Sequence, residues 1–290
     1  ASDVYKRQIY NYKKKNNKLW CTFSHDQIDL NFKDPLVLIE FIEIVLLLLS
    51  KGVTTFRLDA VAFIWKKNGT SCVNLPETHE IVKLLRLIVN YINPHALIVT
   101  ETNLPRKENL SYFGNNDEAN WIYNFPLPPL ILYTFLFEDS SKISGWSKSM
   151  PPAQINNAYL NFIASHDGIG MRPAEGILDN IILDKLFKRV KKNGGKFSFR
   201  KVETKNKVYE VNITLFDALK RTDFDKDGIF AVERYIAAHS ILLALEGVPA
   251  IYFNSLFGTS NDQNAFIKTG IKRNINCLLY TSDAADDVYC

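Results

Sequence analysis

Three carboxylates stand in sequence contexts that could support nucleophilic and acid–base chemistry. Asp59, Glu101 and Asp167 each follow a short run of β-forming residues. In a parallel barrel, catalytic side chains come from the carboxyl ends of the strands, where the βα loops converge. Retaining sugar transfer needs a nucleophilic carboxylate and a general acid about 5 Å apart. We therefore expect all three carboxylates to point into one cavity. The alternative interpretation is that each carboxylate is a helix N-cap or a charge on the protein surface.

Further residues beside these carboxylates could bind a substrate. Arg57 lies two residues before Asp59, so strand alternation places both side chains on the same side of the sheet. A guanidinium there would lower the pKa of Asp59 and keep it ionised. Phe63 and Asn103 follow the ends of two catalytic strands and are pocket candidates, with core packing and turn formation as alternatives.

The elements that would position these residues alternate between strands and helices. The expected strands are residues 54–58, 96–100, 121–125, 160–164 and 248–254, and the expected helices are 75–93, 129–137 and 233–246. An earlier helix is expected from the N-cap Asp34 and the first-turn Pro35 to a stop at Gly52. This alternation predicts an α/β fold with a parallel sheet and right-handed crossovers.

Five such strands predict a partial (β/α)8 TIM barrel, about strands 4 to 8 with their helices, because a closed barrel needs eight. Residues 196–202 and 207–213 predict an inserted β-hairpin within an elaborated loop over 174–220. We expect the N-terminal barrel strands and a C-terminal β domain to be missing. Residues 1–8 and 277–290 resemble translated sequencing adapter, so we interpret them as a non-native leader and tail around a partial catalytic barrel at 9–276.

Composition excludes several classes of protein. The 290 residues are 47% hydrophobic with a net charge of +4, which is typical of a packed globular protein and does not indicate nucleic-acid binding. The longest apolar run, 44–49, is far shorter than the ~20 residues of a membrane span. Four scattered cysteines (Cys21, Cys72, Cys277 and Cys290) are interpreted as free thiols, which favours a cytoplasmic location.

An acidic turn at residues 223–228 resembles the start of a calcium loop. The twelfth position of such a loop should be Glu, but it is Arg234, whose positive charge would repel calcium. We therefore expect no metal site and interpret this turn as the cap of the helix that contains Glu233.

Longer motifs carry a family resemblance. Residues 56–60, 99–103 and 164–168 resemble the three main catalytic regions of the α-amylase superfamily, and 27–31 resemble its Q-x-D-L-N region. Residues 69–72, 75–79, 167–173 and 247–252 are similar to the sucrose phosphorylase group. The resemblance extends from about Trp20 to Asn276, with motif order and spacing preserved.

The resemblance implies roles for individual residues. Asp59 would form a β-glucosyl ester, and Glu101 would protonate the departing oxygen and then activate the acceptor, so the pKa of Glu101 should exceed that of Asp59. Asp167 would hold sugar hydroxyls in the oxocarbenium-like transition state, His166 would contact the sugar, and Arg57 would hold Asp59.

Two arginines are further candidates for substrate binding. Arg172 could bind phosphate or an anionic acceptor through its bidentate fork, with a solvated loop arginine as the alternative. Arg273 lies in a segment where the family carries arginines.

The implied function is retaining α-glucosyl transfer by double displacement, with reversible phosphorolysis of sucrose or a related glucoside to α-glucose 1-phosphate. Related enzymes of the group use sucrose 6′-phosphate or glucosylglycerate. The alternatives are an α-glucosidase or transglycosidase on the same carboxylates and an inactive carbohydrate-binding barrel. We expect no cofactor other than phosphate as co-substrate, no nucleic-acid or membrane partner, and a possible homodimer of the full-length protein.

Overall fold

The chain forms two compact units. The structure is a computed structural model that describes residues 6–12, 15–23, 27–202 and 205–277. The first unit comprises residues 1–102, 108–122 and 201–205, and the second comprises 103–107, 123–200 and 206–290. Each unit has its own cluster of buried apolar side chains.

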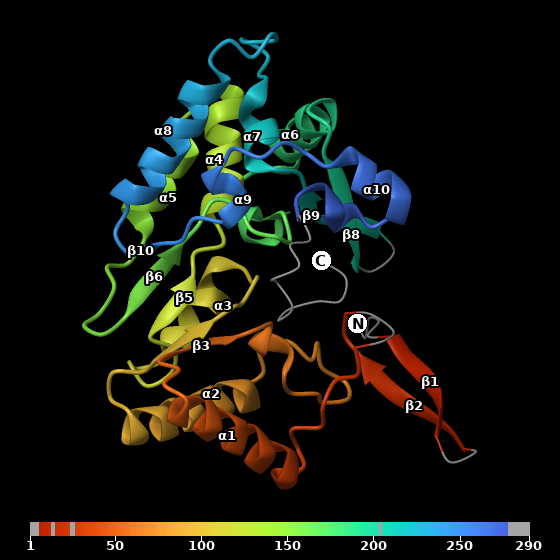
Figure 1. Cartoon of the computed structure of the whole chain (residues 1–290), viewed down its shortest axis with the longest axis vertical. Helices are drawn as coiled ribbons and strands as arrows, with labels where there is room; N and C mark the ends of the chain where they lie inside the picture. The colour runs from red at the N-terminus through yellow and green to blue at the C-terminus, as the bar shows by residue number, and fades with distance from the viewer. Residues whose placement is uncertain (1–5, 13–14, 24–26, 203–204, 278–290) are drawn as a thin grey trace. The chain divides into compact units, whose positions relative to one another are not determined.

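The first unit contains helices α1 and α2 and parallel strands (Figure 1). Its main elements are α1 (Pro35–Ser50), β3 (Thr55–Leu58), η1 (Val61–Phe63), α2 (Pro76–Ile92), β4 (Leu97–Thr100) and η2 (Ser111–Phe113). An antiparallel hairpin of β1 (Lys6–Tyr12) and β2 (Lys15–Cys21) precedes them. Its core joins both helices to the strands through Val45, Phe56, Ile81, Leu85, Val89, Ala96 and Ile98.

Helix α1 begins and ends where the sequence predicts. The Asp34 side chain accepts a hydrogen bond from the backbone N–H of Leu36 at 3.0 Å, and Pro35 is the first helical residue. The chain leaves the helix through Gly52, whose φ of 89° suits glycine. The helix is apolar, and Leu36, Ile39 and Leu47 are exposed on its surface.

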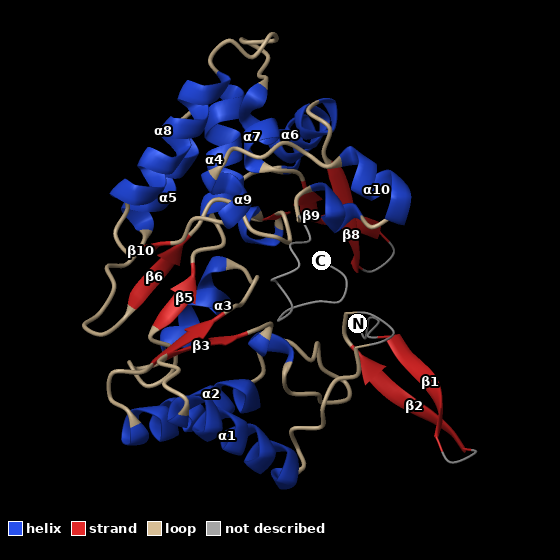
Figure 2. Ribbon diagram, in the orientation of Figure 1, coloured by secondary structure: helices blue, strands red, loops and turns tan. Residues whose placement is uncertain are grey.

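The second unit holds most of the helices (Figure 2). Its elements are α4 (Leu127–Phe137), α5 (Ser141–Ser149), β6 (Ala158–Asn161), β7 (Ile169–Gly170), η3 (Arg172–Ala174), α6 (Asn180–Lys192), β8 (Lys196–Val202), β9 (Lys205–Asn212), α7 (Leu215–Lys220), α8 (Ala231–Ala244), β10 (Val248–Pro249), α9 (Phe253–Leu256), α10 (Gln263–Thr269) and η4 (Lys272–Ile275). Helix α4 is apolar on every side and almost wholly buried, so it forms the centre of this core. Helix α3 (Arg106–Leu110) and β5 (Trp121–Tyr123) lie at the division between the units.

The parallel sheet has five strands, in the order β10-β6-β5-β4-β3. The register pairs β3 with β4, β4 with β5 and β6 with β10, all parallel. Chain order is therefore kept across the sheet, as expected for successive βα units. This confirms the predicted α/β fold with five barrel-type strands.

Strands β5, β6 and β10 are shorter than expected, and β5 ends at Tyr123 and not at residue 125. Strand β6 ends at Asn161, not at residue 164, and the buried Asn161 amide donates to the Glu246 carbonyl. Strand β10 has only two residues, although the Ala250 N–H still donates to the Asn161 carbonyl at 2.7 Å, and α9 begins at Phe253. Asp167 consequently lies in a turn six residues beyond a strand and not directly at its end.

The predicted hairpin is confirmed and is larger than expected. Strands β7, β9 and β8 form a three-stranded sheet, in which Ile169 pairs with Val211 antiparallel. Residues 174–220 also contain α6, which the prediction of an elaborated loop missed. Its N-cap Asp179 accepts a hydrogen bond from the Ile182 N–H at 2.8 Å.

The cysteines only partly follow the sequence prediction. Cys21 and Cys72 are both buried, and Cys72 is a free thiol as the sequence predicts. Cys277 takes part in a disulfide, so the prediction of free thiols is wrong there, and Cys290 lies outside the described residues. Within the described part of the chain, we find no helix long and apolar enough to span a membrane.

The acidic turn precedes helix α8 but does not cap it, so the sequence prediction of a cap is wrong: the N-cap residue is Phe230, and its side chain makes no capping hydrogen bond. The Asp225 carboxylate accepts hydrogen bonds from the backbone N–H groups of Gly228, Ile229 and Phe230, each at 2.9 Å. It also pairs with Arg234 at 2.9 Å, so the residue that stands where a calcium loop has Glu joins this turn to helix α8. The hydrogen bond from Phe230 is the largest cause that lowers the pKa of Asp225 from 3.8 to about 2.

We expect Asp225→Asn to reduce stability in a pH-dependent way. A carboxylate with a lowered pKa in the folded state stabilises that state above its unfolded pKa, and this stabilisation is lost as pH falls from about 4 to about 2. The variant should therefore melt below the wild type near neutral pH, and the gap should narrow on acidification. Thermal melts followed by circular dichroism at about pH 7 and about pH 3 test this, with the exposed Asp227→Asn as control. An equal gap at both pH values would contradict it.

Candidate active site

The ends of β3 and β4 bring two of the predicted catalytic carboxylates to neighbouring positions in the first unit. Leu58 pairs with Thr100, and the Glu101 N–H donates to the Leu58 carbonyl at 3.1 Å. The Glu101 carboxylate in turn accepts the backbone N–H of Ala60, the residue after Asp59, at 2.9 Å. Ala60 has a φ of 44°, a left-handed conformation that costs a non-glycine residue energy. The chain thus turns sharply after Asp59, and Glu101 holds this turn.

Arg57 contacts the predicted nucleophile directly. Its Nη2 lies 2.7 Å from Oδ1 of Asp59, as strand alternation predicts for residues two apart. The Asp59 side chain is 69% exposed, so a substrate could reach its carboxylate. An ion pair this exposed adds little stability, so its effect is to orient the carboxylate.

Phe63 lies in η1, directly after this turn. Its ring packs edge-on against Phe23 at a centroid distance of 5.3 Å. Lys66 donates to the Phe63 carbonyl and pairs with Asp29 at 2.7 Å, and both charged side chains are largely buried. Asp29 belongs to the Q-x-D-L-N region, so that motif supports the loop after β3 through Lys66.

In the second unit, Asp167 lies in a tight turn with two basic residues against its carboxylate. Arg273 Nη2 is 2.5 Å from Oδ1 of Asp167, and His166 Nε2 is 3.4 Å from the same oxygen. Gly168 closes the turn with a φ of 102°, and a Cβ there would lie 2.3 Å from the Val211 carbonyl oxygen. The turn therefore requires glycine at this position.

The basic candidates of the second unit differ in their surroundings. Arg273 binds the Asp167 carboxylate, so its observed contact orients that carboxylate, whereas the sequence predicts a contact with substrate. Arg172 begins η3 and is half-buried. Asn103 lies against β7, since a Cβ at Gly170 would be 2.8 Å from its Nδ2.

The candidate residues thus form two groups, one in each unit. Arg57, Asp59, Phe63 and Glu101 belong to the first unit; Asn103, His166, Asp167, Arg172 and Arg273 belong to the second. The contacts inside each group are those described above. The meeting of all three carboxylates in one cavity stays a prediction.

Sequence reasoning missed two buried asparagines beside the Asp167 turn. Asn212 and Asn276 donate through their side-chain amides to the backbone carbonyls of Asp167 and His166. The sequence carried no distinct signal for Asn212, which occupies a polar position of the alternating run at residues 207–213. Asn276 follows a helical turn and carried no signal of its own.

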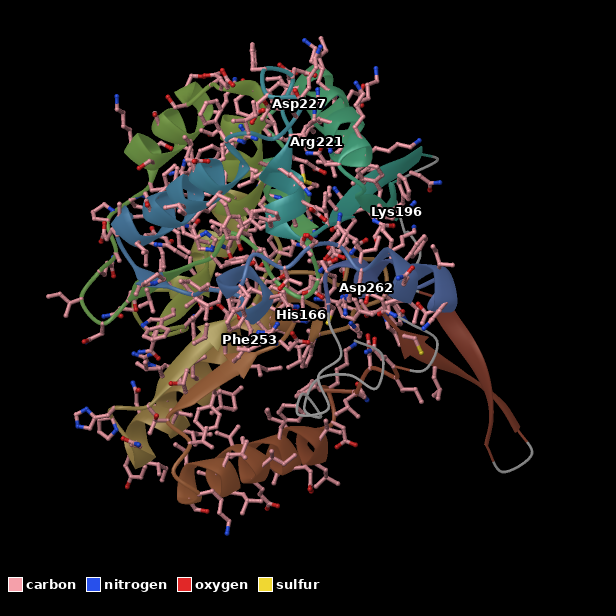
Figure 3. The ribbon with its side chains drawn as sticks, turned by 45° about the horizontal axis from the view of Figure 1, so that its top comes forward. His166, Lys196, Arg221, Asp227, Phe253 and Asp262 are labelled. Atoms are coloured by element: carbon pink, nitrogen blue, oxygen red, sulfur yellow. The ribbon has the colours of Figure 1, made fainter. Side chains whose placement is uncertain are left out.

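Acidic groups elsewhere do not assemble into a metal site in the described part of the chain. No group of three or more His, Cys, Asp or Glu side chains there could hold a metal ion. The acidic turn lies apart from the candidate residue His166: Figure 3 shows Asp227 and Arg221 well separated from it.

Comparison with known proteins gives a consistent pattern. Residues 2–168 match the alpha amylase catalytic domain. A glucosylglycerate phosphorylase of Allomeiothermus silvanus is 45% identical over 91% of this chain and 48% of its own length, and one of Escherichia coli is 41% identical over 91% and 47%. The crystal structure of sucrose 6F-phosphate phosphorylase from Thermoanaerobacter thermosaccharolyticum superposes with a TM-score of 0.79 at 25% identity, over 92% of this chain and 52% of that one. The chain spans about half the length of the curated relatives it matches.

Proposed function

Because this chain belongs to the alpha amylase catalytic domain family, we propose that the whole protein is a retaining α-glucosyl phosphorylase. The observation that best supports this proposal is the contact between the Glu101 carboxylate and the Ala60 N–H. It holds the predicted acid/base beside the predicted nucleophile Asp59, at the ends of adjacent parallel strands. Retaining double displacement requires the two carboxyl groups to lie about 5 Å apart.

The proposed reaction has two steps. Asp59 attacks the anomeric carbon of the donor while Glu101 protonates the departing oxygen, which leaves a β-glucosyl ester on Asp59. Phosphate then attacks the anomeric carbon from the opposite face, its proton passes to Glu101, and the ester bond breaks. The product is α-glucose 1-phosphate, and two inversions preserve the donor's configuration.

The second unit would bind the sugar. We place the Asp167 carboxylate, oriented by Arg273, against the glucosyl hydroxyls, where hydrogen bonds strengthen as positive charge develops on the ring. His166, next to Asp167, would contact the same sugar. Arg172 and Phe63 are the proposed groups for the anionic acceptor and the sugar face, and Asn103 is a further proposed contact.

We propose glucosylglycerate as the donor. The relatives that are 41% to 45% identical carry the name glucosylglycerate phosphorylase, whereas a sucrose phosphorylase of Agrobacterium vitis is 28% identical. A glycerate product is a carboxylate, for which an arginine fork such as that of Arg172 is a suitable partner. An α-glucosidase on the same carboxylates is the alternative function.

The test supplies the whole protein with phosphate and one of three donors: glucosylglycerate, glucosylglycerol or sucrose. We expect α-glucose 1-phosphate to form fastest from glucosylglycerate. Free glucose as the main product, with no dependence on phosphate, would favour the hydrolase. Absence of any glucosyl transfer from all three donors would overturn the proposal.

A further inference from the structure

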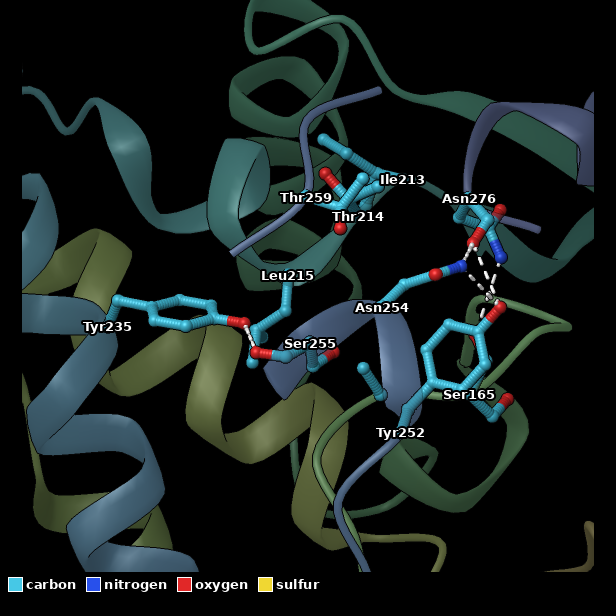
Figure 4. Close-up of a pocket in the computed structure, with 11 residues that line it drawn as sticks. Ser165, Ile213, Thr214, Leu215, Tyr235, Tyr252, Asn254, Ser255, Thr259 and Asn276 are labelled. Carbon is cyan, nitrogen blue, oxygen red and sulfur yellow. Dashed lines mark hydrogen bonds between the residues drawn. The ribbon is translucent and has the colours of Figure 1, made fainter. Parts of the chain in front are cut away.

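Two buried asparagines hold the backbone of the turn that carries Asp167. Asn276 Nδ2 lies 2.5 Å from the His166 carbonyl oxygen and 3.3 Å from that of Ser165 (Figure 4 shows Asn276 beside Ser165). Asn212 Nδ2 lies 2.9 Å from the Asp167 carbonyl oxygen. Three consecutive carbonyl groups are therefore bonded to amides from segments that lie far away in the sequence.

Both asparagines are built into the core of the second unit. Each is 1% exposed, so water cannot replace their amide groups at the turn. The Asn212 Oδ1 accepts a hydrogen bond from the Ser198 hydroxyl at 2.9 Å, which fixes the orientation of the amide. The Asn276 Oδ1 has no hydrogen-bond partner within the described residues, so there Asn276 acts through its N–H groups alone.

Few other bonds within the turn define its shape. The Gly168 N–H donates to the Ser165 carbonyl at 3.1 Å, and the Ser165 hydroxyl donates weakly to the Gly168 carbonyl at 3.3 Å. Gly168 has a φ of 102°. Because glycine can adopt many backbone conformations, Gly168 alone does not hold the turn in this one. External donors are thus needed to keep the Asp167 side chain in one place.

We propose that Asn212 and Asn276 are positioning residues that hold Asp167 in its reactive geometry. This rests on the proposed function for Asp167 itself, but neither asparagine touches the substrate in our account. A displacement of about 1 Å at a catalytic group can cost on the order of 100-fold in rate. Loss of either amide would move the peptide groups on both sides of Asp167.

The experiment compares Asn212→Leu and Asn276→Leu with a matched control in the whole protein. Asn193→Leu is the control because its Nδ2 also donates to two backbone carbonyls, those of Ala218 at 2.9 Å and Arg221 at 3.0 Å. Arg221, whose carbonyl accepts a hydrogen bond from Asn193, is well separated from His166 in Figure 3. The control substitution therefore lies apart from the turn that carries Asp167.

We expect kcat for glucose 1-phosphate release to fall about 10- to 100-fold in the two test variants, with the donor KM within about threefold of wild type. Asn193→Leu should keep kcat within about threefold, and its melting temperature should fall less than that of the test variants, because Asn193 is half-buried and water can replace part of its hydrogen bonding. Equal kcat losses in all three variants, in proportion to their loss of stability, would overturn the proposal.

A second variant tests the proposal without placing a leucine in the core. In Asn276→Asp, the protonated carboxyl group can still donate a hydrogen bond to the His166 carbonyl. The ionised carboxylate cannot donate and repels that carbonyl oxygen. Burial raises the pKa of such a carboxyl, so kcat should fall as pH rises through an ionisation that the wild type and Asn193→Asp lack. A pH profile identical to that of the wild type would count against the proposal.

Hydrogen exchange separates this proposal from the proposed function. Amides of residues 165–168 should exchange faster in Asn276→Leu than in the wild type, whereas Asn193→Leu should leave them unchanged. If the wild type transfers no glucose, the proposed function fails, and exchange alone decides whether the asparagines hold the turn. Unchanged exchange in both test variants would show that they do not.

Discussion

Replacing Asp59 by Asn should lower kcat of the whole protein by on the order of 10⁴-fold or more. The amide cannot form the glucosyl ester, so the double displacement loses its first bond. The substitution keeps the size of the side chain and leaves the Glu101 contact with Ala60 in place. The Arg57 ion pair is lost, but it is exposed and contributes little to folding.

The measurement is the phosphate-dependent release of glucose 1-phosphate at saturating donor, together with a melting curve of each protein. Asp227→Asn serves as the control, since Asp227 is exposed in the acidic turn. We expect the control to retain activity near that of the wild type. An Asp59→Asn variant that keeps more than about a tenth of wild-type activity would refute the nucleophile assignment.

The second large effect concerns Glu101. In Glu101→Gln, kcat for donors with a poor leaving group should fall about 10²- to 10⁴-fold, because no acid protonates the departing oxygen. With α-glucosyl fluoride the loss should be much smaller, since fluoride departs with little protonation. Phosphate is already an anion, so the second step should suffer less than the first.

This expectation is tested by the rates of the wild type and of Glu101→Gln, each measured with a donor that has a poor leaving group and with α-glucosyl fluoride. Glu80→Gln is the control, because Glu80 is exposed and pairs only with Lys83 among the contacts described here. Equal losses with both donors would mean that Glu101 does not act as the general acid.

The sequence predicted much of the fold because local signals and tertiary demands agreed. Helix α2 was expected over 75–93 and spans Pro76–Ile92, since its apolar face matches one helical period. Strands β3 and β4 end directly before Asp59 and Glu101, as their β-forming runs indicate. The start of helix α8 was expected after the acidic turn, but the turn does not supply its N-cap.

The errors arose where tertiary contacts decide the structure. The apolar run after β6 resembles a strand, but β6 ends at Asn161, whose side-chain amide donates to the Glu246 carbonyl. Strand β10 ends after Pro249, although the Ala250 N–H still donates to the Asn161 carbonyl. The amides of Asn212 and Asn276 meet the turn that carries Asp167 only after folding, and no local pattern in a single sequence marks such partners.

The most direct test of the account is to trap the covalent intermediate. The whole protein carrying Glu101→Gln would be incubated with 2-deoxy-2-fluoro-α-glucosyl fluoride, digested and analysed by tandem mass spectrometry. The account predicts one fluoroglucosyl group per protein, attached to the carboxylate of Asp59. A label on another residue, or turnover with inversion of the anomeric centre and no adduct, would contradict it.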